Sequence, residues 1–310
     1  MKKSLLFLLL VSVLSVHAQD NRIWQVKLQK EYNKSYPVGK EGIILLNQHG
    51  KMSIETWDKQ EVRVEAKISV SAQNNDYATK LLEGINIKDE IKDGNIMYQT
   101  ELAITNSYSD DNSSGHEMHI DWVAHIPANA RLQAENNFGA MTIGDFKGES
   151  VLVSKYGSLT AGKLSNCRDL RVEFGKATIA SLSDSRVLFR YARALDIGKL
   201  SGKIEGEMLF CNSVDLPVDN DLKQLTLKNN YTNLYLMVPK DISADYDITT
   251  TNARVTAKND MVIREEKEPE TNAAVRRVSY TPNRHYTGSL GKGGGLKIEI
   301  RSNFGNIRVL

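Results

Sequence analysis

The chain has 310 residues, with 40 Lys and Arg, 38 Asp and Glu, and a formal net charge of +2. A protein that holds nucleic acid or an anionic membrane normally carries a clear basic excess on one face, so this balance disfavours both partners. The length suffices for two ordinary domains or for one elongated repeat array.

The first 18 residues have the pattern of a secretory signal peptide. Lys2 and Lys3 form a positive start, residues 5–16 are apolar apart from serines, and Val16-His17-Ala18 supplies a small-x-small cleavage pattern. The apolar run is too short to span a bilayer. We therefore expect an exported chain that begins at Gln19 and has no transmembrane segment. Without Lys2 and Lys3, its 38 basic residues balance its 38 acidic ones.

Residues 19–125 are predicted to be rich in β-strands, with one short helix. Residues 76–85 carry apolar side chains on one helical face, and Asp93-Gly94 between two alternating runs predicts a hairpin. Residues 106–116 are polar and predict a loop. One run predicts a strand with a single buried face, by alternation of these residues: Val62, Val64, Ala66, Ile68 and Val70.

Residues 126–310 contain a repeat. Segments 141–146, 159–164, 177–182 and 195–200 match one another at a spacing of 18 residues, and apolar residues alternate within each unit. Such a unit cannot bury its own face, so it must stack on its neighbours at about 4.8 Å. The sequence predicts an all-β fold, a β-helix or β-solenoid of roughly 18-residue coils, with a loop excursion at about 264–295.

An aromatic residue followed by a small one precedes each repeat segment. Facing inward, these rings would form a core ladder, and their alternation with Val172 and Ile179 favours this arrangement. Facing outward, stacked rings could hold sugars. The two interpretations concern one column of residues: Phe138, Tyr156, Phe174 and Tyr191.

The two cysteines are predicted to be buried free thiols. Cys211 lies beside the aromatic position, whereas Cys167 lies near a corner about two coils earlier. Two coil spacings are about 9–10 Å, which exceeds the separation that a disulfide tolerates.

Further motifs recur along nearly the whole mature chain, namely Asn47-x-x-Gly50-x-Met52-x-Ile54, Thr56-Trp57-Asp58, and the repeated Tyr/Phe-Gly units up to Asn303-Phe304-Gly305. Together these motifs resemble the bacterial putative adhesin family of envelope proteins. The resemblance implies a β-helix-like fold and an envelope location, and it carries over no catalytic or ligand-binding residue.

Residues that could carry chemistry are few. Glu117, His119, Asp121 and His125 would alternate onto one face of a strand, which spreads them along about 20 Å, so we interpret them as a solvated outer face rather than a metal site. Residues 288–293 lack the spacing of a phosphate-binding loop. We expect no metal, no cofactor and no catalytic residue.

Three functions remain open on the sequence. The first is a non-enzymatic surface-binding protein, an adhesin of the periplasm or outer surface of a Gram-negative bacterium, that contacts a glycan or an envelope protein. The second is a carbohydrate-active enzyme, which would need charged residues in register on successive coils. One corner column varies in type instead: Asp145, Lys163, Ser181 and Lys199. The third is an envelope signalling or stress partner.

Overall fold

The computed structural model describes residues 26–103, 115–239, 241–257, 264–266 and 283–310. The predicted signal peptide and most of the polar loop at 106–116 lie outside these residues, as does the middle of the segment 264–295. Within the described residues the chain forms 24 strands and one helix, so the all-β class is confirmed.

The elements follow one another in chain order as β1 Val26–Pro37, β2 Gly42–Gln48, β3 Met52–Trp57, β4 Glu61–Ala72, α1 Asn75–Glu83, β5 Ile85–Lys92, β6 Asn95–Leu102, β7 Glu117–Pro127, β8 Leu132–Asn137, β9 Ala140–Ile143, β10 Ser150–Lys155, β11 Ser158–Leu164, β12 Cys167–Glu173, β13 Lys176–Arg190, β14 Ala194–Ile197, β15 Leu200–Leu209, β16 Ser213–Pro217, β17 Leu222–Asn230, β18 Asn233–Met237, β19 Ala244–Thr251, β20 Val255–Ala257, β21 Arg264–Glu266, β22 Asn283–Leu290, β23 Leu296–Asn303 and β24 Ile307–Val309.

The predicted helix and hairpin are both confirmed in the N-terminal part. Helix α1 begins at an Asn74 cap, whose side chain accepts a hydrogen bond from the backbone N–H of Tyr77 at 2.8 Å. Its apolar face buries Ala78 and Leu81. Asp93 and Gly94 both have positive φ and join β5 to β6, as a tight hairpin turn requires.

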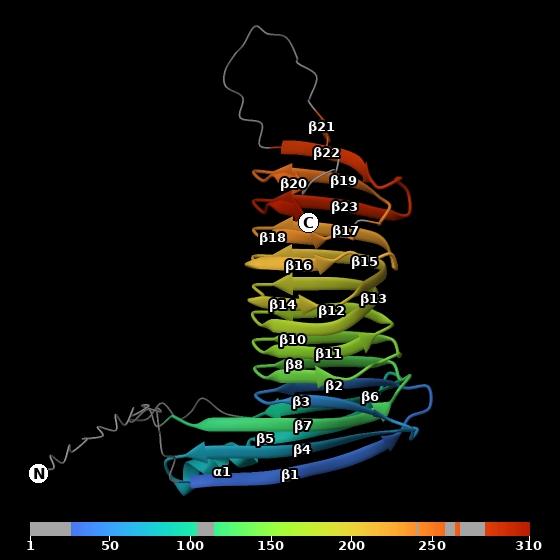
Figure 1. Ribbon diagram of the computed structural model, residues 1–310. Coiled ribbons are helices and arrows are strands. Elements are labelled where there is room, and N and C mark those ends of the chain that lie inside the picture. The colour runs from blue at the N-terminus through green and yellow to red at the C-terminus, as the bar shows by residue number, and fades with distance from the viewer. Residues whose placement is uncertain (1–25, 104–114, 240, 258–263, 267–282) are drawn as a thin grey trace, which may run out of the picture.

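The strands stack along one axis around a single core (Figure 1). Parallel pairing places like positions above one another. One inward column is apolar throughout and runs from β2 to β13, with these members: Leu45, Ala134, Leu152, Leu170 and Val187. Because each strand leaves one face apolar, burial of these columns holds the stack together.

The predicted β-helix or β-solenoid of roughly 18-residue coils is wrong. The strands form one mixed sheet of 20 strands and a second sheet of four. Their order in space departs from chain order: β2 lies between β6 and β8, and β23 lies between β17 and β19 (Figure 1). Antiparallel partners join at both ends, as in β1–β4–β7 and β19–β22.

The step between neighbours also varies. Leu152 pairs with Leu170, eighteen residues on, whereas Gly206 pairs with Leu227, twenty-one residues on. A strand takes the neighbour whose buried side chains and free edge match its own, wherever that neighbour stands in the chain. The four regular units therefore describe only the middle of the stack. The predicted segment boundary at residues 125 and 126 falls inside β7.

At the N-terminal end of the stack, a polar contact joins strands β1 and β5. The hydroxyl of Tyr32 on β1 donates to Asp89 on β5 at 2.8 Å, and the hydroxyl of Tyr36 donates to the same carboxylate. For Tyr32, burial and then the hydrogen bond to Asp89 raise the pKa. β1 also carries Lys27, Lys30, Lys34 and Pro37, residues that protect a sheet edge from pairing with other chains.

One corner recurs at nine places, each between the end of one strand and the start of the next. A non-glycine residue there has a φ of 50–60°, the left-handed region that such residues rarely adopt. The residue that follows is tightly packed. At Gly139, Gly157 and Gly175 an added Cβ would lie 1.8–2.3 Å from the carbonyl oxygen of the preceding corner. Glycine is therefore required for these corners to approach so closely.

We predict that Gly157→Ala destabilises the fold by about 2–4 kcal/mol, because the new Cβ would lie 1.9 Å from the Gly139 carbonyl oxygen. The matched control is Gly144→Ala, at an exposed position with no atom within 4 Å of the added Cβ. Thermal unfolding of the two variants beside the parent protein measures the effect. Equal melting temperatures for both variants would contradict the described packing.

Candidate functional site

Stacked aromatic rings occupy the recurring corner. Neighbouring ring centroids are 4.8–5.0 Å apart and the planes differ by 3–14°. We call this set the aromatic ladder, and its members in spatial order are His49, Phe138, Tyr156, Phe174, Tyr191, Phe210, Tyr231 and Phe304. The ninth corner, at Asn252, has no ring and lies beyond Phe304.

The ladder faces solvent, so the inward arrangement that the alternation favoured is wrong. Six of its rings belong to residues that are 44–51 % exposed, and His49 and Phe174 are half-buried. The reason is the backbone. Strand β12 ends at Glu173, and the φ of 55° at Phe174 interrupts the two-residue alternation that would have placed this ring beside Val172. The inner position belongs instead to the small residue after the ring.

Corners near both ends of the ladder are held from inside by buried polar side chains. The Asn47 amide donates to the Ile120 carbonyl at 3.0 Å and to the Asn136 side chain at 3.1 Å. Near the other end, Asn229 donates to the Thr232 carbonyl and to the Ser302 hydroxyl, both at 2.7 Å. Buried backbone carbonyls at these two places are thereby satisfied, which stiffens the chain beneath the rings at the two ends of the ladder.

The stacking decides which part of each ring is available. Each ring within the ladder covers the faces of its neighbours, so the exposed surface consists of ring edges. Seven steps of 4.8–5.0 Å make a ridge about 34 Å long. Aromatic edges carry partial positive charge and faces partial negative charge. At the first ring, burial lowers the pKa of His49 and the nearby His116 adds to the effect, which favours the neutral imidazole.

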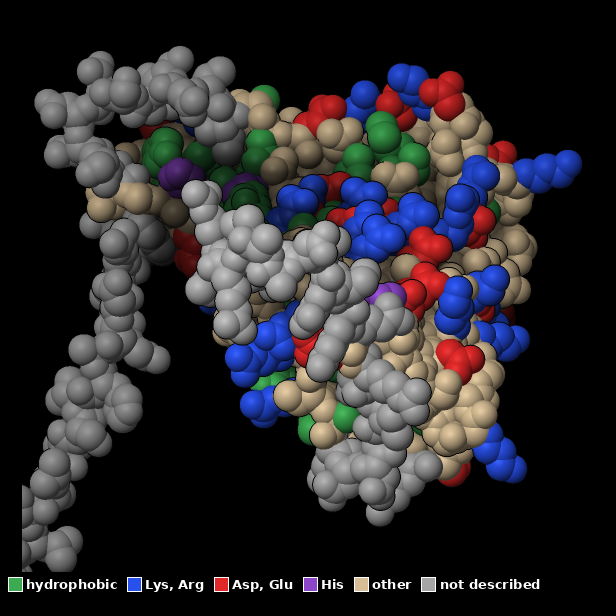
Figure 2. Space-filling view, turned by 90° about the horizontal axis from the view of Figure 1, so that it is seen from above, with side chains coloured by type: hydrophobic (Ala, Val, Ile, Leu, Met, Phe, Trp, Pro, Cys, Tyr) green, Lys and Arg blue, Asp and Glu red, His purple; other side chains and the backbone are tan. Residues whose placement is uncertain are grey.

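The outer face of the large sheet beside the ridge carries charges of both signs. Lys155 pairs with Glu135 at 3.0 Å, and Arg190 pairs with Glu173 at 3.3 Å. At the end of the stack that is seen from above, basic and acidic side chains are likewise interspersed (Figure 2). The described residues of the outer sheet face therefore show no excess of one charge sign that would attract an oppositely charged ligand from a distance.

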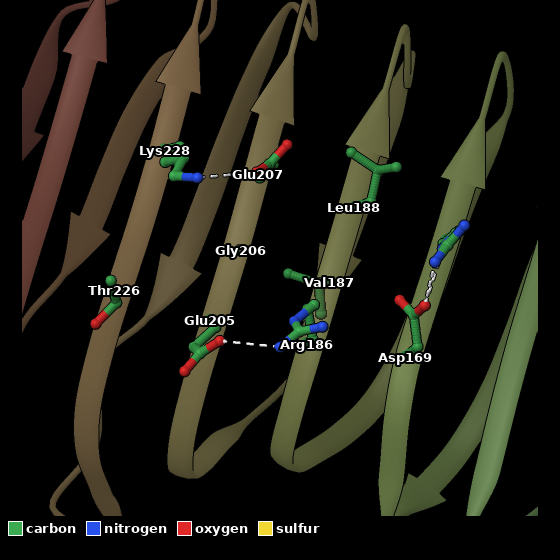
Figure 3. A pocket seen from close by; sticks show the side chains of 10 residues that line it. Asp169, Arg186, Val187, Leu188, Glu205, Gly206, Glu207, Thr226 and Lys228 are labelled. Atoms are coloured by element: carbon green, nitrogen blue, oxygen red, sulfur yellow. Dashed lines mark hydrogen bonds and ion pairs between the residues drawn. The ribbon is translucent and has the colours of Figure 1, made fainter.

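A shallow hollow of about 490 Å³ lies on the same outer face, over β12, β13, β15 and β17. Leu188 is its outward apolar side chain, and charged residues surround it (Figure 3). Each charge has an opposite partner in three ion pairs, which are Arg171–Asp169, Arg186–Glu205 and Lys228–Glu207. The hollow depends on the strand register of this sheet, which changes between units. The 18-residue pattern therefore does not predict it.

The structure brings two of the four metal-site candidates into contact and gives the other two different partners. His119 lies 3.1 Å from Glu117, while Asp121 accepts from the backbone N–H of Lys51 at 2.8 Å. His125 stacks on Trp57 with ring centroids 5.0 Å apart. Among the residues that the structure describes, no group of three or more His, Cys, Asp or Glu could hold a metal ion.

The remaining sequence candidates have structural contacts. Both cysteines are free and buried, as predicted, and burial raises the pKa of Cys167 to about 11. In the glycine-rich segment, the Ser289 hydroxyl donates to Asp245 at 2.7 Å and the Gly294 N–H donates to the same carboxylate at 3.0 Å. In the corner column, Asp145 accepts from the backbone N–H of Lys163 at 2.8 Å.

No helix in the described part of the chain has the length and apolar character needed to cross a membrane. Neither a family model nor a curated protein matches the sequence.

Several solved structures are similar over most of their length. A putative adhesin from Bacteroides fragilis has 10 % identity and a TM-score of 0.42, over 91 % of this chain and 97 % of that one. A putative adhesin from Parabacteroides merdae has 11 % identity and a TM-score of 0.31, over 91 % and 96 %. A putative lipid binding protein from Parabacteroides distasonis has 9 % identity and a TM-score of 0.30, over 90 % and 96 %.

The two adhesins bear the name of the family that the sequence motifs resemble. With identities near 10 % and TM-scores below 0.5, these likenesses assign no residue a role.

We predict that Phe174→Ala lowers stability by about 1–3 kcal/mol, because it removes two stacked contacts, each worth about 0.5–1.5 kcal/mol. Phe174→Gly should lose about 1 kcal/mol less than the alanine variant, since glycine adopts the φ of 55° without strain. Urea unfolding midpoints of the two variants separate the ring contribution from the backbone contribution. A glycine variant less stable than the alanine variant would show that this corner is not left-handed.

Proposed function

We propose that this chain is a non-enzymatic surface-binding protein of the bacterial cell envelope, and that its partner, a glycan or an envelope protein, lies along the ridge of the aromatic ladder. The observation that carries the proposal is the unbroken row of exposed ring edges. Its location rests on the signal-peptide pattern of residues 1–18. We place it in the periplasm or at the outer surface of a Gram-negative bacterium.

The size of the ridge supports this proposal. An aromatic side chain offers about 150–250 Å², so six Phe and Tyr rings exposed by about half, together with the less exposed Phe174, present roughly 500–800 Å². Specific interfaces bury about 800 Å² on each partner. Contiguous apolar surface of this size on a soluble protein usually marks a binding site.

The backbone conformation of the corners also supports the proposed binding role of the ridge. Each ring sits on a left-handed corner that costs about 1–3 kcal/mol, and stacking and the internal hydrogen bonds offset this strain. A row of rigid rings also binds at low entropic cost, because few rotatable bonds have to be ordered.

A second candidate function is carbohydrate-active catalysis at the hollow of Figure 3. Glu205 and Glu207 project from β15 onto the same outer face, and pairs of carboxylates cleave glycosidic bonds when suitably spaced. Both carboxylates form ion pairs with basic residues, Glu205 with Arg186 and Glu207 with Lys228. Release of reducing ends from a polysaccharide, abolished in Glu207→Gln, would favour this function over simple binding.

The binding proposal is tested with purified mature chain and isolated envelope fractions, namely peptidoglycan sacculi and outer-membrane vesicles. Tyr156→Asn and Tyr231→Asn remove rings while keeping the corner, because Asn252 already occupies the same corner with a φ of 52°. Ile91→Thr is the control, since Ile91 is 58 % exposed and lies away from the ridge.

We expect saturable cosedimentation with one fraction, weakened at least about tenfold in the double Asn variant and unchanged in Ile91→Thr. Binding to neither fraction, or binding that the Asn variants leave intact, would contradict the proposal.

A further inference from the structure

The Phe and Tyr rings of the ladder alternate strictly along the ridge. In spatial order the seven are Phe138, Tyr156, Phe174, Tyr191, Phe210, Tyr231 and Phe304. A hydroxyl group therefore stands on every second ring. Centroids 4.8–5.0 Å apart place equivalent hydroxyls roughly 10 Å apart along a straight line.

The alternation does not follow chain order or unit length. Tyr231 and Phe304 are neighbours in the ladder although 72 residues lie between them in the chain. The step between successive corners also changes from unit to unit, as the pairing registers show. The hydroxyl period is thus a property of the assembled ridge, which makes it a feature that a ligand can recognise.

The chemistry of the ridge restricts the ligand. Sugar rings that stack on aromatic faces are excluded within the ladder, because each face is covered by the next ring. The edges carry partial positive charge and the tyrosine hydroxyls both donate and accept hydrogen bonds. Such a line suits a polymer with oxygen atoms along its edge at a regular repeat. A lipid acyl chain would leave the hydroxyls of Tyr156, Tyr191 and Tyr231 without partners, at a cost in binding.

We propose that the ridge binds an extended β-1,4-linked polysaccharide along its length, an inference that rests on the proposed function. Successive sugars of such a chain are turned over, so equivalent oxygens return at every second sugar, at a distance close to the spacing of the tyrosine hydroxyls. The bound chain would lie parallel to the stacking axis, with one disaccharide for each Phe-Tyr step of the ladder.

Polar side chains beside the ridge are placed to contribute. Lys155 and Asn230 directly precede Tyr156 and Tyr231 in the chain, and Arg190 directly precedes Tyr191. Each of these residues is half-buried and ends its strand beside the ladder. Amide, ammonium and guanidinium groups of this kind bind sugar hydroxyls in protein sites. Lys155 and Arg190 are held in ion pairs with Glu135 and Glu173, and Asn230 accepts from Asn303, so the hydrogen-bonding atoms that these contacts leave over form a second row parallel to the rings.

The test uses defined oligosaccharides and titration calorimetry on the full mature chain. Chitin-type and cellulose-type β-1,4 oligomers of two to eight sugars are compared with α-1,4 glucose oligomers of equal length, which coil and lack the straight repeat. The triple variant Tyr156→Phe, Tyr191→Phe and Tyr231→Phe removes the hydroxyls and keeps every ring. Tyr235→Phe, on the outer face of the four-stranded sheet, is the control.

We expect affinity for β-1,4 oligomers to rise with length up to about six sugars, and α-1,4 oligomers to bind at least tenfold more weakly. Removing three hydrogen bonds should weaken β-1,4 binding by about 10- to 100-fold, with no change for Tyr235→Phe. The chitin-type and cellulose-type arms report whether the acetamido groups of a bacterial wall or chitin polymer are also recognised. Binding of either type supports the inference.

Failures of the two proposals are distinguishable. If envelope fractions bind in a ridge-dependent way while β-1,4 oligomers do not bind, or bind equally well to the triple Phe variant, the glycan inference is overturned and the surface-binding function stands. If the Asn variants at the ridge have no effect on any fraction, the proposed function fails as well.

Discussion

The left-handed corner is the constraint on which the rest of the structure depends. At this position the chain turns from one strand into the next, and the residue after the turn packs against the carbonyl oxygen of the preceding corner, so closely that Gly139 and Gly157 leave no room for a Cβ. The turn points the preceding side chain away from the core. Successive strands lie about 4.8 Å apart, which is also close to the stacking distance of aromatic rings, so large planar side chains at the corner meet face to face outside the protein.

Ring stacking in turn offsets the free-energy cost of the strained backbone that positions the rings. Left-handed non-glycine residues are destabilising when isolated, whereas each new ring in the ladder gains a stacked neighbour on either side. Buried amides such as Asn47 and Asn136 hold the turns from within. The result is a rigid row of ring edges in which each ring is held by its stacked neighbours. A rigid row of this kind is better suited to holding an extended polymer than to enclosing a small molecule, which would need a concave site.

Several elements followed from local pattern alone. Alternation at Val62 to Val70 gave strand β4, Asp93-Gly94 gave the hairpin, and helix α1 lies within one residue or two of its predicted position. The cysteines were also placed correctly as free thiols. The strand, the hairpin and the helix depend on residues close in sequence, and the turn chemistry or periodicity that specifies them is visible in a short window.

The global pairing and the site could not be predicted in the same way. Nothing local indicates that β23 enters between β17 and β19, because that choice depends on which distant edges and buried faces match. The outward direction of the ladder was not predicted because the two-residue alternation of the strand was assumed to continue to Phe174, where the backbone changes conformation. A signal was present in the sequence: each ring immediately precedes a small residue, a position typical of a corner and not of a strand interior.

Tyrosine-selective iodination of the native protein, followed by peptide mass spectrometry, tests most directly whether the ladder is an external surface. We expect rapid modification of Tyr156, Tyr191 and Tyr231, which are 44–51 % exposed, and protection of Tyr98, which is 0 % exposed. Ladder tyrosines as protected as Tyr98 would place the rings in the core and contradict an external ladder.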